Sequence, residues 1–274
     1  MAMPNDLVFV RHGESEANIV QQADKSGLSH AQNDEVFDRP DWEQRLSSRG
    51  IEQVKQARAW VDQHLGGAKS FDLRYFSPFL RTRETAAYLG GEDCGNWIMD
   101  DRVVERSWGI YGMLSRAERE KKFEQTAKMY RQSPWYTKLD GGESRYEVSD
   151  RFRDFQGTLH READGKRVLV VTHGDFMGVA RCNLERMLPE QFEKVEHDPT
   201  QDVKNCAIFH YSRINPSDPE DVRPKLSFRR LVNPTDLASS PFDGEWRELP
   251  QRPKFTGAEL LAQADRAPRL IPGE

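Results

Sequence analysis

The sequence has few features that would fix its shape covalently or anchor it in a membrane. Its three cysteines, Cys94, Cys182 and Cys206, are an odd number without the short spacing of a zinc site, and this pattern favours a reducing compartment over a disulfide framework. No apolar stretch approaches the roughly 18 residues that a membrane-spanning helix needs. The first residues also lack the basic and apolar segments of a secretory signal. We therefore expect a cytoplasmic protein without a membrane partner.

An excess of positive charge is absent as well. The 40 lysines and arginines are outnumbered by 45 aspartates and glutamates, which gives a formal net charge of −5. Because the basic residues are also scattered along the chain, the sequence gives no electrostatic case for a nucleic-acid partner. Any site for an anion must therefore come from a local cluster of arginines.

Three patterns that often carry phosphate or metal chemistry are missing. No cysteine stands six residues before an arginine, as in the cysteine phosphatases, and there is no Gly-x4-Gly-Lys phosphate loop. No pair of histidines has the short spacing from which a metal site would start. A metal centre built from His12, His173 and Glu105 is therefore disfavoured, and we expect no bound metal.

What the sequence does contain is a repeated pattern, an apolar run that ends in His-Gly. The run at 7–10 leads into Arg11 and His12, and the run at 168–171 leads, through a threonine, into His173. Each histidine is followed by a glycine, which gives the backbone the freedom to turn out of a strand. Uninterrupted apolar runs of this length are typical of strands buried on both faces of a parallel sheet.

A third strand-like segment adds a second arginine to this pattern. The segment at 71–76 is followed by Ser77 and Pro78, which we expect to cap a helix at 80–89 and so to place Arg81 in its first turn. Since the carboxyl ends of parallel strands share one edge of a sheet, the three strand exits should converge there. Guanidinium groups bind phosphate oxygens bidentately, and a helix N-terminus attracts anions. The sequence therefore predicts a phosphate site at this edge.

The order of the segments predicts the fold class. Helices are expected at 51–65, 80–89, 115–132, 144–159 and 175–188, and closing strands at 205–212 and 225–231. Strands that alternate with helices predict an α/β fold, a doubly wound three-layer sandwich with a mostly parallel central sheet. We expect one domain over 1–232, with a long loop at 19–46 that is a candidate lid. An irregular tail with one helix near 256–265 is expected over 233–274.

These motifs resemble the histidine phosphatase superfamily, in its phosphoglycerate-mutase-like branch. The resemblance rests on several short strings that occur in the family's order between residues 7 and 212, and the tail lies outside it. They are the Arg-His-Gly-Glu string at 11–14 with Ser15 and Asn18, the segments at 46–50 and 77–86, Glu105-Arg106 with Trp108-Gly109, the Gly-Gly-Glu-Ser string at 141–144, and Thr172-His173-Gly174.

The resemblance implies a role for each matching residue. His12 matches the nucleophile that takes up the phosphoryl group as phosphohistidine, and Glu105 matches the general acid. Residues that match phosphate-pocket or substrate positions are Arg11, Ser15, Asn18, Arg81, Arg106, Trp108, His173 and Gly174, of which Arg11, Arg81 and His173 also belong to the catalytic set. The family chemistry requires no metal and no cofactor.

The resemblance leaves more than one reaction open. We favour a phosphatase, in which water takes the phosphoryl group from His12, a small phosphorylated metabolite is the substrate and inorganic phosphate is a product. The alternative is a phosphoglycerate-type mutase primed by a 2,3-bisphosphoglycerate-type cofactor. Trp108 stands near the place of a substrate-gripping tyrosine in the mutases, and this difference weakens the mutase case. A non-catalytic phosphate-binding protein is the third alternative. The natural substrate and the oligomeric state stay open.

Overall fold

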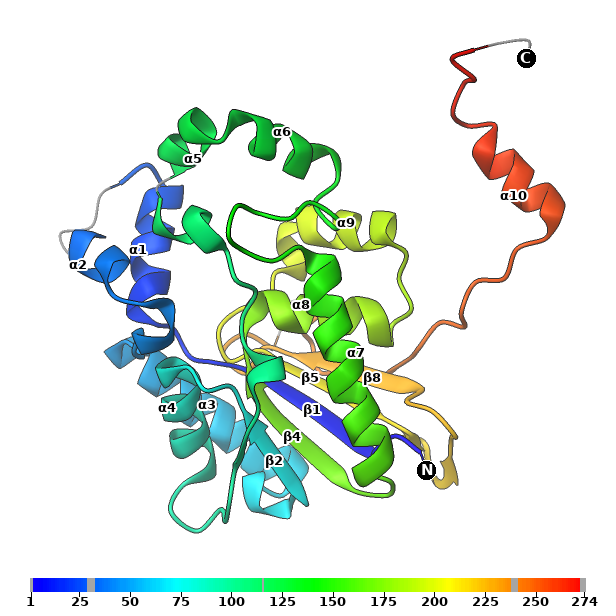
Figure 1. Cartoon of the computed structure of the whole chain (residues 1–274). Coiled ribbons are helices and arrows are strands. Elements are labelled where there is room, and N and C mark those ends of the chain that lie inside the picture. The colour runs from blue at the N-terminus through cyan, green and yellow to red at the C-terminus, as the bar shows by residue number, and fades with distance from the viewer. Residues whose placement is uncertain (1, 29–32, 115, 238–240, 272–274) are drawn as a thin grey trace.

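A sheet of seven strands forms the centre of the computed structural model, which describes residues 2–28, 33–114, 116–237 and 241–271 (Figure 1). The strands lie in the order β3 (Ile98–Met99), β2 (Leu73–Phe76), β4 (Arg167–Thr172), β1 (Asp6–Arg11), β5 (Ile208–Ser212), β8 (Phe228–Val232) and β9 (Arg247–Glu248). The first four of these pair in parallel, and the last three join by antiparallel pairing. The predicted α/β class with a mostly parallel sheet is confirmed.

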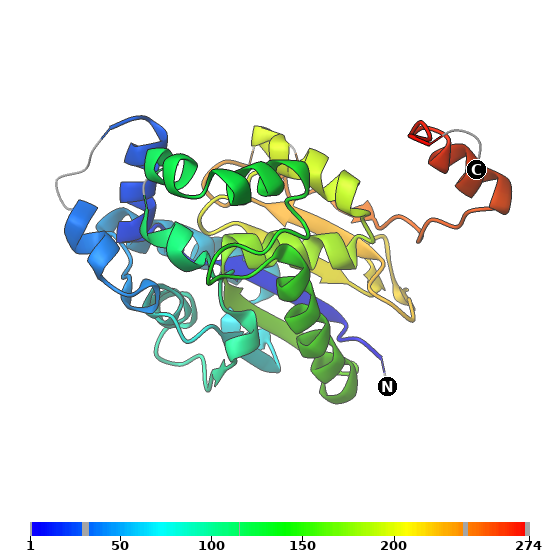
Figure 2. The same ribbon diagram turned by 45° about the horizontal axis from the view of Figure 1, so that its top comes forward.

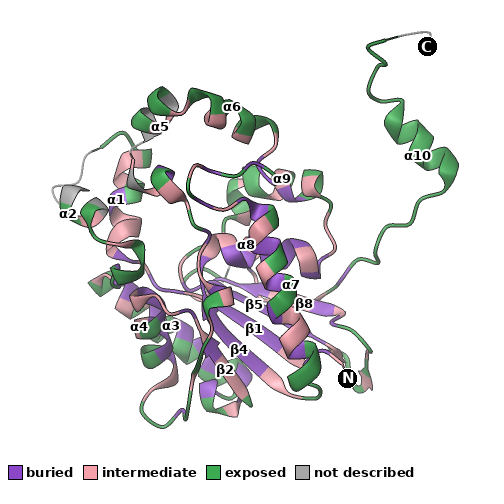
Figure 3. Ribbon diagram, viewed as in Figure 1, coloured by how far each residue is buried: buried purple, intermediate pink, exposed green. Residues whose placement is uncertain are grey.

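Alternate residues of the central strands face two separate apolar clusters. On one face, Leu7 and Phe9 pack with residues of α7 (Arg145–Glu162) and α8 (Gly174–Leu184). On the other face, Val8 and Val10 pack with residues of α3 (Ser48–Leu65) and α4 (Leu80–Gly90). Because successive strand side chains point to opposite faces, one apolar run supplies both cores. Figure 3 shows the buried residues concentrated in the sheet and on the helix faces turned toward it, as expected of three layers.

Short helices gather beyond the carboxyl ends of the parallel strands. Figures 1 and 2 show α1 (Glu16–Lys25), α2 (Asn33–Asp38), α5 (Arg116–Lys122) and α6 (Glu124–Gln132) at this end of the molecule. Further elements are the 3-10 turns η1 (Asp41–Glu43), η2 (Ala68–Ser70), η3 (Asp101–Val103), η4 (Gly109–Met113) and η5 (Pro199–Gln201), the helix α9 (Pro189–His197), and the hairpin of β6 (Ile214–Asn215) and β7 (Asp218–Val222).

The expectation of a long loop at 19–46 is wrong for most of that segment. Helix α1 begins after Ser15, whose hydroxyl accepts a hydrogen bond from the backbone amide of Asn18. The Asn18 side chain in turn accepts a hydrogen bond from the Ser15 backbone amide, which completes a capping box. Only Val20 of this helix is buried, so the segment lacks the apolar stripe by which sequence analysis finds helices. The helix α2 and the turn η1 follow, and residues 29–32 lie outside the described part of the chain.

Other helix boundaries also shift. Helix α4 begins at Leu80 with Phe79 at its N-cap, so Ser77 and Pro78 precede the helix and do not cap it. The helix predicted at 115–132 is broken into α5 and α6 at Phe123, and Ser115 is outside the described residues. The helix predicted at 175–188 ends at Leu184, and α9 starts a new one. The capping box predicted at Ser144 and Glu147 is confirmed at the start of α7.

The tail does not become irregular at residue 233. Phe242 and Leu249 are buried in the same apolar cluster as Phe9, and β9 pairs with β8 at the edge of the sheet. The sequence does not predict this strand, because two residues at the edge of a sheet are too few to show an alternating pattern, and the residues around them are polar or proline. The helix predicted near 256–265 is confirmed as α10 (Gly257–Ala264). It stands away from the body in Figure 1, and residues 250–271 are exposed.

No helix in the described part of the chain has the length and apolar character to cross a bilayer.

The contribution to stability of the segment after residue 232, through its packing against the core, is testable. We expect Phe242→Ala to lower the free energy of unfolding by about 3–5 kcal/mol, because it deletes a buried ring from the core. Phe255→Ala removes the same ring from an exposed position and should change stability by less than about 0.5 kcal/mol. Urea denaturation followed by circular dichroism measures both, and similar losses for the two variants would contradict this packing.

Candidate active site

The two histidines of the repeated pattern meet at the edge of the sheet. Strands β1 and β4 pair in parallel with Arg11 opposite Thr172, and the His12 amide donates to the Thr172 carbonyl at 2.9 Å. Both side chains are buried, and their ring centroids lie 5.2 Å apart at an interplanar angle of 64°. The predicted convergence of His12 and His173 is therefore present in the structure.

Hydrogen bonding fixes which nitrogen of His12 is free. The Nδ1 atom lies 2.7 Å from the Gly13 carbonyl oxygen. A carbonyl only accepts hydrogen bonds, so Nδ1 holds the proton and Nε2 keeps its lone pair. Burial lowers the pKa of His12 well below its usual value of 6.5, and the charges of Arg81 and Arg11 lower it further. The ring is thus a neutral nucleophile at neutral pH.

His173 is held by a residue that sequence analysis assigned to a helix cap. Its Nε2 lies 2.8 Å from the Ser77 hydroxyl, and the edge of the Phe79 ring packs against it at a centroid distance of 5.0 Å. Its Nδ1 is buried without a hydrogen-bond partner in the structure. Burial, followed by the charge of Arg81, lowers the pKa of His173 well below 6.5. Ser77 therefore positions an imidazole and does not cap the helix.

Arg11 lies against the start of α8. A Cβ placed on Gly174 would come within 3.2 Å of the Cζ and Nε atoms of Arg11, so only glycine leaves the guanidinium its full space. One terminal nitrogen of Arg11 donates to the Val203 carbonyl, and its buried Nε has no hydrogen-bond partner. Gly174 therefore leaves room for Arg11 in the site, and its predicted contact with phosphate or substrate stays a prediction.

Arg81 is buried and reaches the same centre, since its charge acts on both imidazoles and on Glu105. Its terminal nitrogens, however, hold the side chain of Asp41 in η1, with Nη1 3.0 Å from Oδ1 and Nη2 3.2 Å from Oδ2. Asp41 was not among the residues that the sequence singled out.

Ser15 and Asn18 are used by the fold. Both take part in the capping box of helix α1, and the side-chain oxygen Oδ1 of Asn18 also accepts a hydrogen bond from the Asn205 side chain at 3.1 Å. The same Asn205 amide donates to the His12 carbonyl at 3.1 Å. Asn205 thus joins the β1 exit to the segment before β5, a role with no sequence signal. The structure gives Ser15 and Asn18 a positioning contact near His12, and their predicted contact with phosphate stays a prediction.

Glu105 sits at the N-terminus of α8. One carboxylate oxygen accepts from the amides of Arg106 at 2.9 Å and Phe176 at 3.1 Å, and the other accepts from the Asp175 amide at 3.3 Å. Burial raises the pKa of Glu105 above its usual 4.5, and the neighbouring charge of Asp175 raises it further, while the Arg106 hydrogen bond opposes both. A carboxyl group that keeps its proton to higher pH is suited to act as a general acid.

Two buried arginines lie beside Asp175. The Nε atom of Arg106 is 2.9 Å from a carboxylate oxygen of Asp175, and Arg145 contributes a nitrogen 3.8 Å from the other oxygen. The guanidinium of Arg106 stacks over the Trp108 ring at 4.1 Å, and a terminal nitrogen of it donates to the Tyr130 hydroxyl at 3.3 Å. The predicted residues Arg106 and Trp108 are therefore in contact with each other.

Arg145 and Asp175 were missed by the sequence analysis. Arg145 was read only as part of a capping box, and an acidic residue in the first turn of a helix is ordinary. A signal existed at Asp175, which directly follows His173-Gly174 at the predicted phosphate edge. Among the residues that the structure describes, no three His, Cys, Asp or Glu side chains cluster as metal ligands would.

Comparison with known families agrees with this geometry. The family model described as histidine phosphatase superfamily (branch 1) matches residues 7–208, which include both histidine loops and Glu105. This chain belongs to that superfamily.

Its relatives include both phosphatases and mutases. Within the superfamily, it is 29% identical to phosphoserine phosphatase 1 of Hydrogenobacter thermophilus, over 65% of this chain and 75% of the relative. It is also 29% identical to the 2,3-bisphosphoglycerate-dependent phosphoglycerate mutase of Parvibaculum lavamentivorans, over 69% and 84% of the two chains. The crystal structure of the alpha-ribazole phosphatase from Shigella flexneri superposes with a TM-score of 0.60 at 20% sequence identity, over 81% of this chain and 96% of that chain. This similarity supports the fold.

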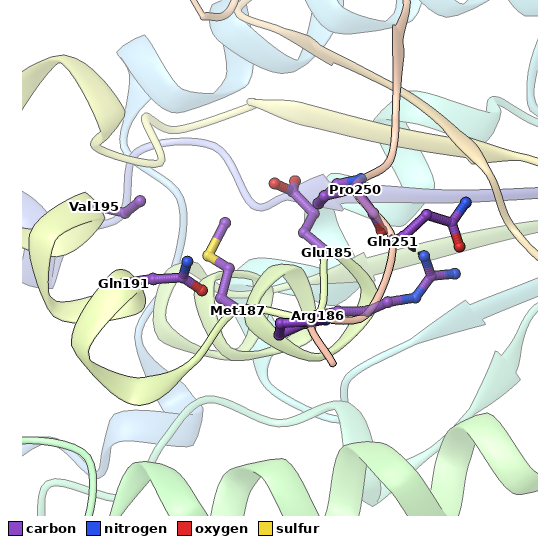
Figure 4. Close-up of a pocket in the computed structure, with 8 residues that line it drawn as sticks. Glu185, Arg186, Met187, Gln191, Val195, Pro250 and Gln251 are labelled. Atoms are coloured by element: carbon purple, nitrogen blue, oxygen red, sulfur yellow. Dashed lines mark hydrogen bonds between the residues drawn. The ribbon is translucent and has the colours of Figure 1, made fainter. Parts of the chain in front are cut away.

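A separate pocket of about 310 Å³ lies at the other end of α8 (Figure 4). It is lined by Glu185, Met187 and Gln191, and by Pro250 from the C-terminal part of the chain. The 11 residues of α8 separate it from Gly174 by about 16 Å at 1.5 Å per residue. None of the predicted site residues lines this pocket, so it is distinct from the histidine site.

The contact between Gly174 and Arg11 gives a test of the site. We expect Gly174→Ala to weaken the binding of inorganic phosphate by roughly tenfold, because the added methyl group displaces the guanidinium from its place. Isothermal titration calorimetry measures the dissociation constant. Gly178→Ala in the same helix is the control, since a Cβ there meets only Phe192, at 3.7 Å. Equal effects of the two changes would argue that α8, and not Arg11, was disturbed.

Proposed function

We propose that this protein is a phosphomonoesterase that hydrolyses small phosphorylated metabolites through a phosphohistidine at His12. The observation that carries the proposal is the state of that ring. His12 is 2% exposed, its Nε2 lone pair is free, and Arg11, Arg81 and His173 surround it with donors for an anion. A neutral imidazole among cationic donors favours attack on an anionic phosphoryl group.

In the first transfer, His12 Nε2 attacks the phosphorus atom. The bond between Nε2 and phosphorus forms as the ester P–O bond breaks, and the leaving alkoxide takes a proton from Glu105. Arg11, Arg81 and the unpartnered Nδ1 of His173 donate to the equatorial oxygens, on which the negative charge is spread. The backbone amides at the start of α8 keep Glu105 oriented toward this centre.

In the second transfer, water replaces the alcohol. Glu105, now ionised, accepts a proton from the water, the oxygen bonds to phosphorus, and the bond from phosphorus to Nε2 breaks. Inorganic phosphate leaves, and His12 returns to its neutral state. We propose that no metal and no cofactor take part, because the cationic side chains supply the charge stabilisation that a metal would otherwise provide.

Hydrolysis is favoured over mutase activity by the residue stacked on Arg106. Trp108 covers that guanidinium with an apolar ring, whereas the mutase pattern has a hydroxyl-bearing tyrosine near this place. The similarity to a phosphoglycerate mutase makes mutase activity the alternative to be tested. Incubation with p-nitrophenyl phosphate, and separately with 3-phosphoglycerate plus a catalytic amount of 2,3-bisphosphoglycerate, separates the two. Hydrolysis without isomerisation supports the phosphatase, faster isomerisation than hydrolysis supports the mutase, and neither reaction supports a phosphate-binding protein.

The nucleophile is tested by replacing it. We expect His12→Ala to abolish turnover and the acid-labile labelling of the protein by a ³²P-labelled ester, because it removes the ring nitrogen that takes the phosphoryl group in the proposed mechanism. His160→Ala, a histidine at the exposed end of α7, is the control and should keep both. Labelling that survives in His12→Ala would assign the nucleophile elsewhere.

The role of Glu105 is tested by the leaving group. We expect Glu105→Gln to slow hydrolysis of an alkyl phosphate by about 10²-fold or more, because an alkoxide needs the proton. An activated aryl phosphate should be slowed far less. Equal losses on both substrates would mean that Glu105 positions α8 and does not protonate the leaving group.

The pH dependence follows from the same two groups. The lowered pKa of His12 keeps the nucleophile neutral into the acidic range, and the raised pKa of Glu105 keeps the acid protonated above its usual range. The kcat/KM for an alkyl phosphate should therefore fall as pH rises through the pKa of Glu105, whereas that for an aryl phosphate should persist to higher pH. Steady-state kinetics across pH, with both substrates, measures the difference, and coincident alkaline limbs would contradict it.

A further inference from the structure

Arg81 is already occupied by a carboxylate. Its Nη1 donates to the Asp41 main-chain carbonyl at 2.6 Å and to Oδ1 at 3.0 Å, and its Nη2 donates to Oδ2 at 3.2 Å. This is the bidentate geometry in which a guanidinium also binds two oxygens of a phosphoryl group. The Asp41 carboxylate therefore stands where a ligand of Arg81 would place its oxygens.

The two partners differ in how firmly they are held. The Arg81 side chain is 5% exposed, packs over the Phe79 ring and starts from the first turn of α4. The Asp41 side chain is 59% exposed and belongs to η1, a 3-10 turn without buried residues. Exposed turns with few apolar contacts are displaced at low cost. The arginine is thus the fixed partner, and the aspartate is the one that can leave.

The chain around η1 allows such a displacement. After the turn, the Leu46 amide and the Arg45 side chain both donate to Glu84 of α4, at 2.7 Å and 2.9 Å. Gln44, directly after the turn, donates its side-chain amide to the carbonyls of two residues before the turn, Val36 at 2.7 Å and Arg39 at 3.1 Å. These contacts anchor the two flanks of η1, whereas the turn itself meets α4 through Asp41.

We propose that Asp41 is an affinity-determining residue of the phosphate site, a carboxylate that competes with phosphate for Arg81. The inference rests on the proposed function, in which Arg81 binds phosphoryl oxygens. The edge of Arg81 formed by Nη1 and Nη2 holds the Asp41 carboxylate, so it cannot bind a phosphoryl group in the same bidentate way at the same time, and the two anions repel each other. A phosphoryl group that binds through this edge therefore releases Asp41, and the return of Asp41 helps to expel inorganic phosphate after the second transfer.

Asp41→Asn tests this proposal, because it keeps the shape of the side chain and removes its charge. If a competing carboxylate holds Arg81 in most molecules, the apparent dissociation constant for inorganic phosphate exceeds the intrinsic one by the inverse of the free fraction. We expect the variant to bind inorganic phosphate on the order of tenfold more tightly, with stronger product inhibition and a lower KM. Isothermal titration calorimetry measures the binding, and inhibition kinetics with added phosphate measures the rest.

Weaker phosphate binding by the Asp41→Asn variant would have a different meaning. If Asp41 only orients Arg81 for the ligand, its loss will weaken phosphate binding, and weaker or unchanged binding in Asp41→Asn overturns the proposal. Glu43→Gln is the matched control, because it removes the same charge from the same exposed turn and leaves the Asp41 contacts with Arg81 in place. Equal tightening in both variants would indicate general charge repulsion and would also overturn it.

Trp42 provides a second measurement, since it lies next to Asp41 and is 57% exposed. Displacement of η1 by phosphate should change the fluorescence of the protein, and Trp42→Phe should remove that change. A phosphate titration with no Trp42-dependent signal contradicts displacement of the turn.

The outcomes separate this inference from the proposed function. A wild-type protein that binds phosphate but hydrolyses no ester refutes the function and leaves the comparison with Asp41→Asn meaningful. A wild-type protein that hydrolyses esters, with equal phosphate affinity in the variant, refutes only the competition. Phosphate binding by neither protein refutes both.

Discussion

The parallel pairing of β1 and β4 is the constraint on which the site depends. Their register places Arg11 opposite Thr172, so that the next residue on each strand is a histidine at the same edge. His12 and His173, which lie 161 positions apart in the chain, are thereby brought into ring contact by backbone hydrogen bonds, and their side chains stay free for chemistry. A slip of this register by one residue would move one imidazole to the other face of the sheet.

This pairing also decides the electrostatics. Both rings are carried below the surface by strands that are buried on both faces, and burial disfavours their charged forms. Arginines brought by β1 and α4 act in the same direction. Burial also disfavours the charged form of Glu105, but it raises the pKa of this group, because the neutral form of a carboxyl group is the protonated one. One environment therefore favours a free nucleophile and a protonated acid at the same pH.

The parts of the fold that can be predicted from the sequence are those with a periodic signal or a motif. The apolar runs of β1 and β4, the capping box of α7 and the repeated His-Gly pattern predict the correct layers and the meeting of His12 with His173. Contacts that join residues without a local pattern cannot be predicted in this way. Helix α1 has only one buried residue, β9 has two residues in all, and Ser77 looks like a cap although its hydroxyl meets His173.

The same limit explains why the carboxylates around the site were missed. A cluster of guanidinium groups is unfavourable until an anion arrives, so a stable ligand-free fold needs internal counter-charges. Asp175 serves Arg106 and Arg145 in this way, and Asp41 serves Arg81. The two differ in exposure, because Asp175 belongs to α8 whereas Asp41 belongs to an exposed turn. In the competition that we propose, Asp41 is thus the counter-charge that leaves when phosphate binds, so that Arg81 is paired in both the empty and the occupied site.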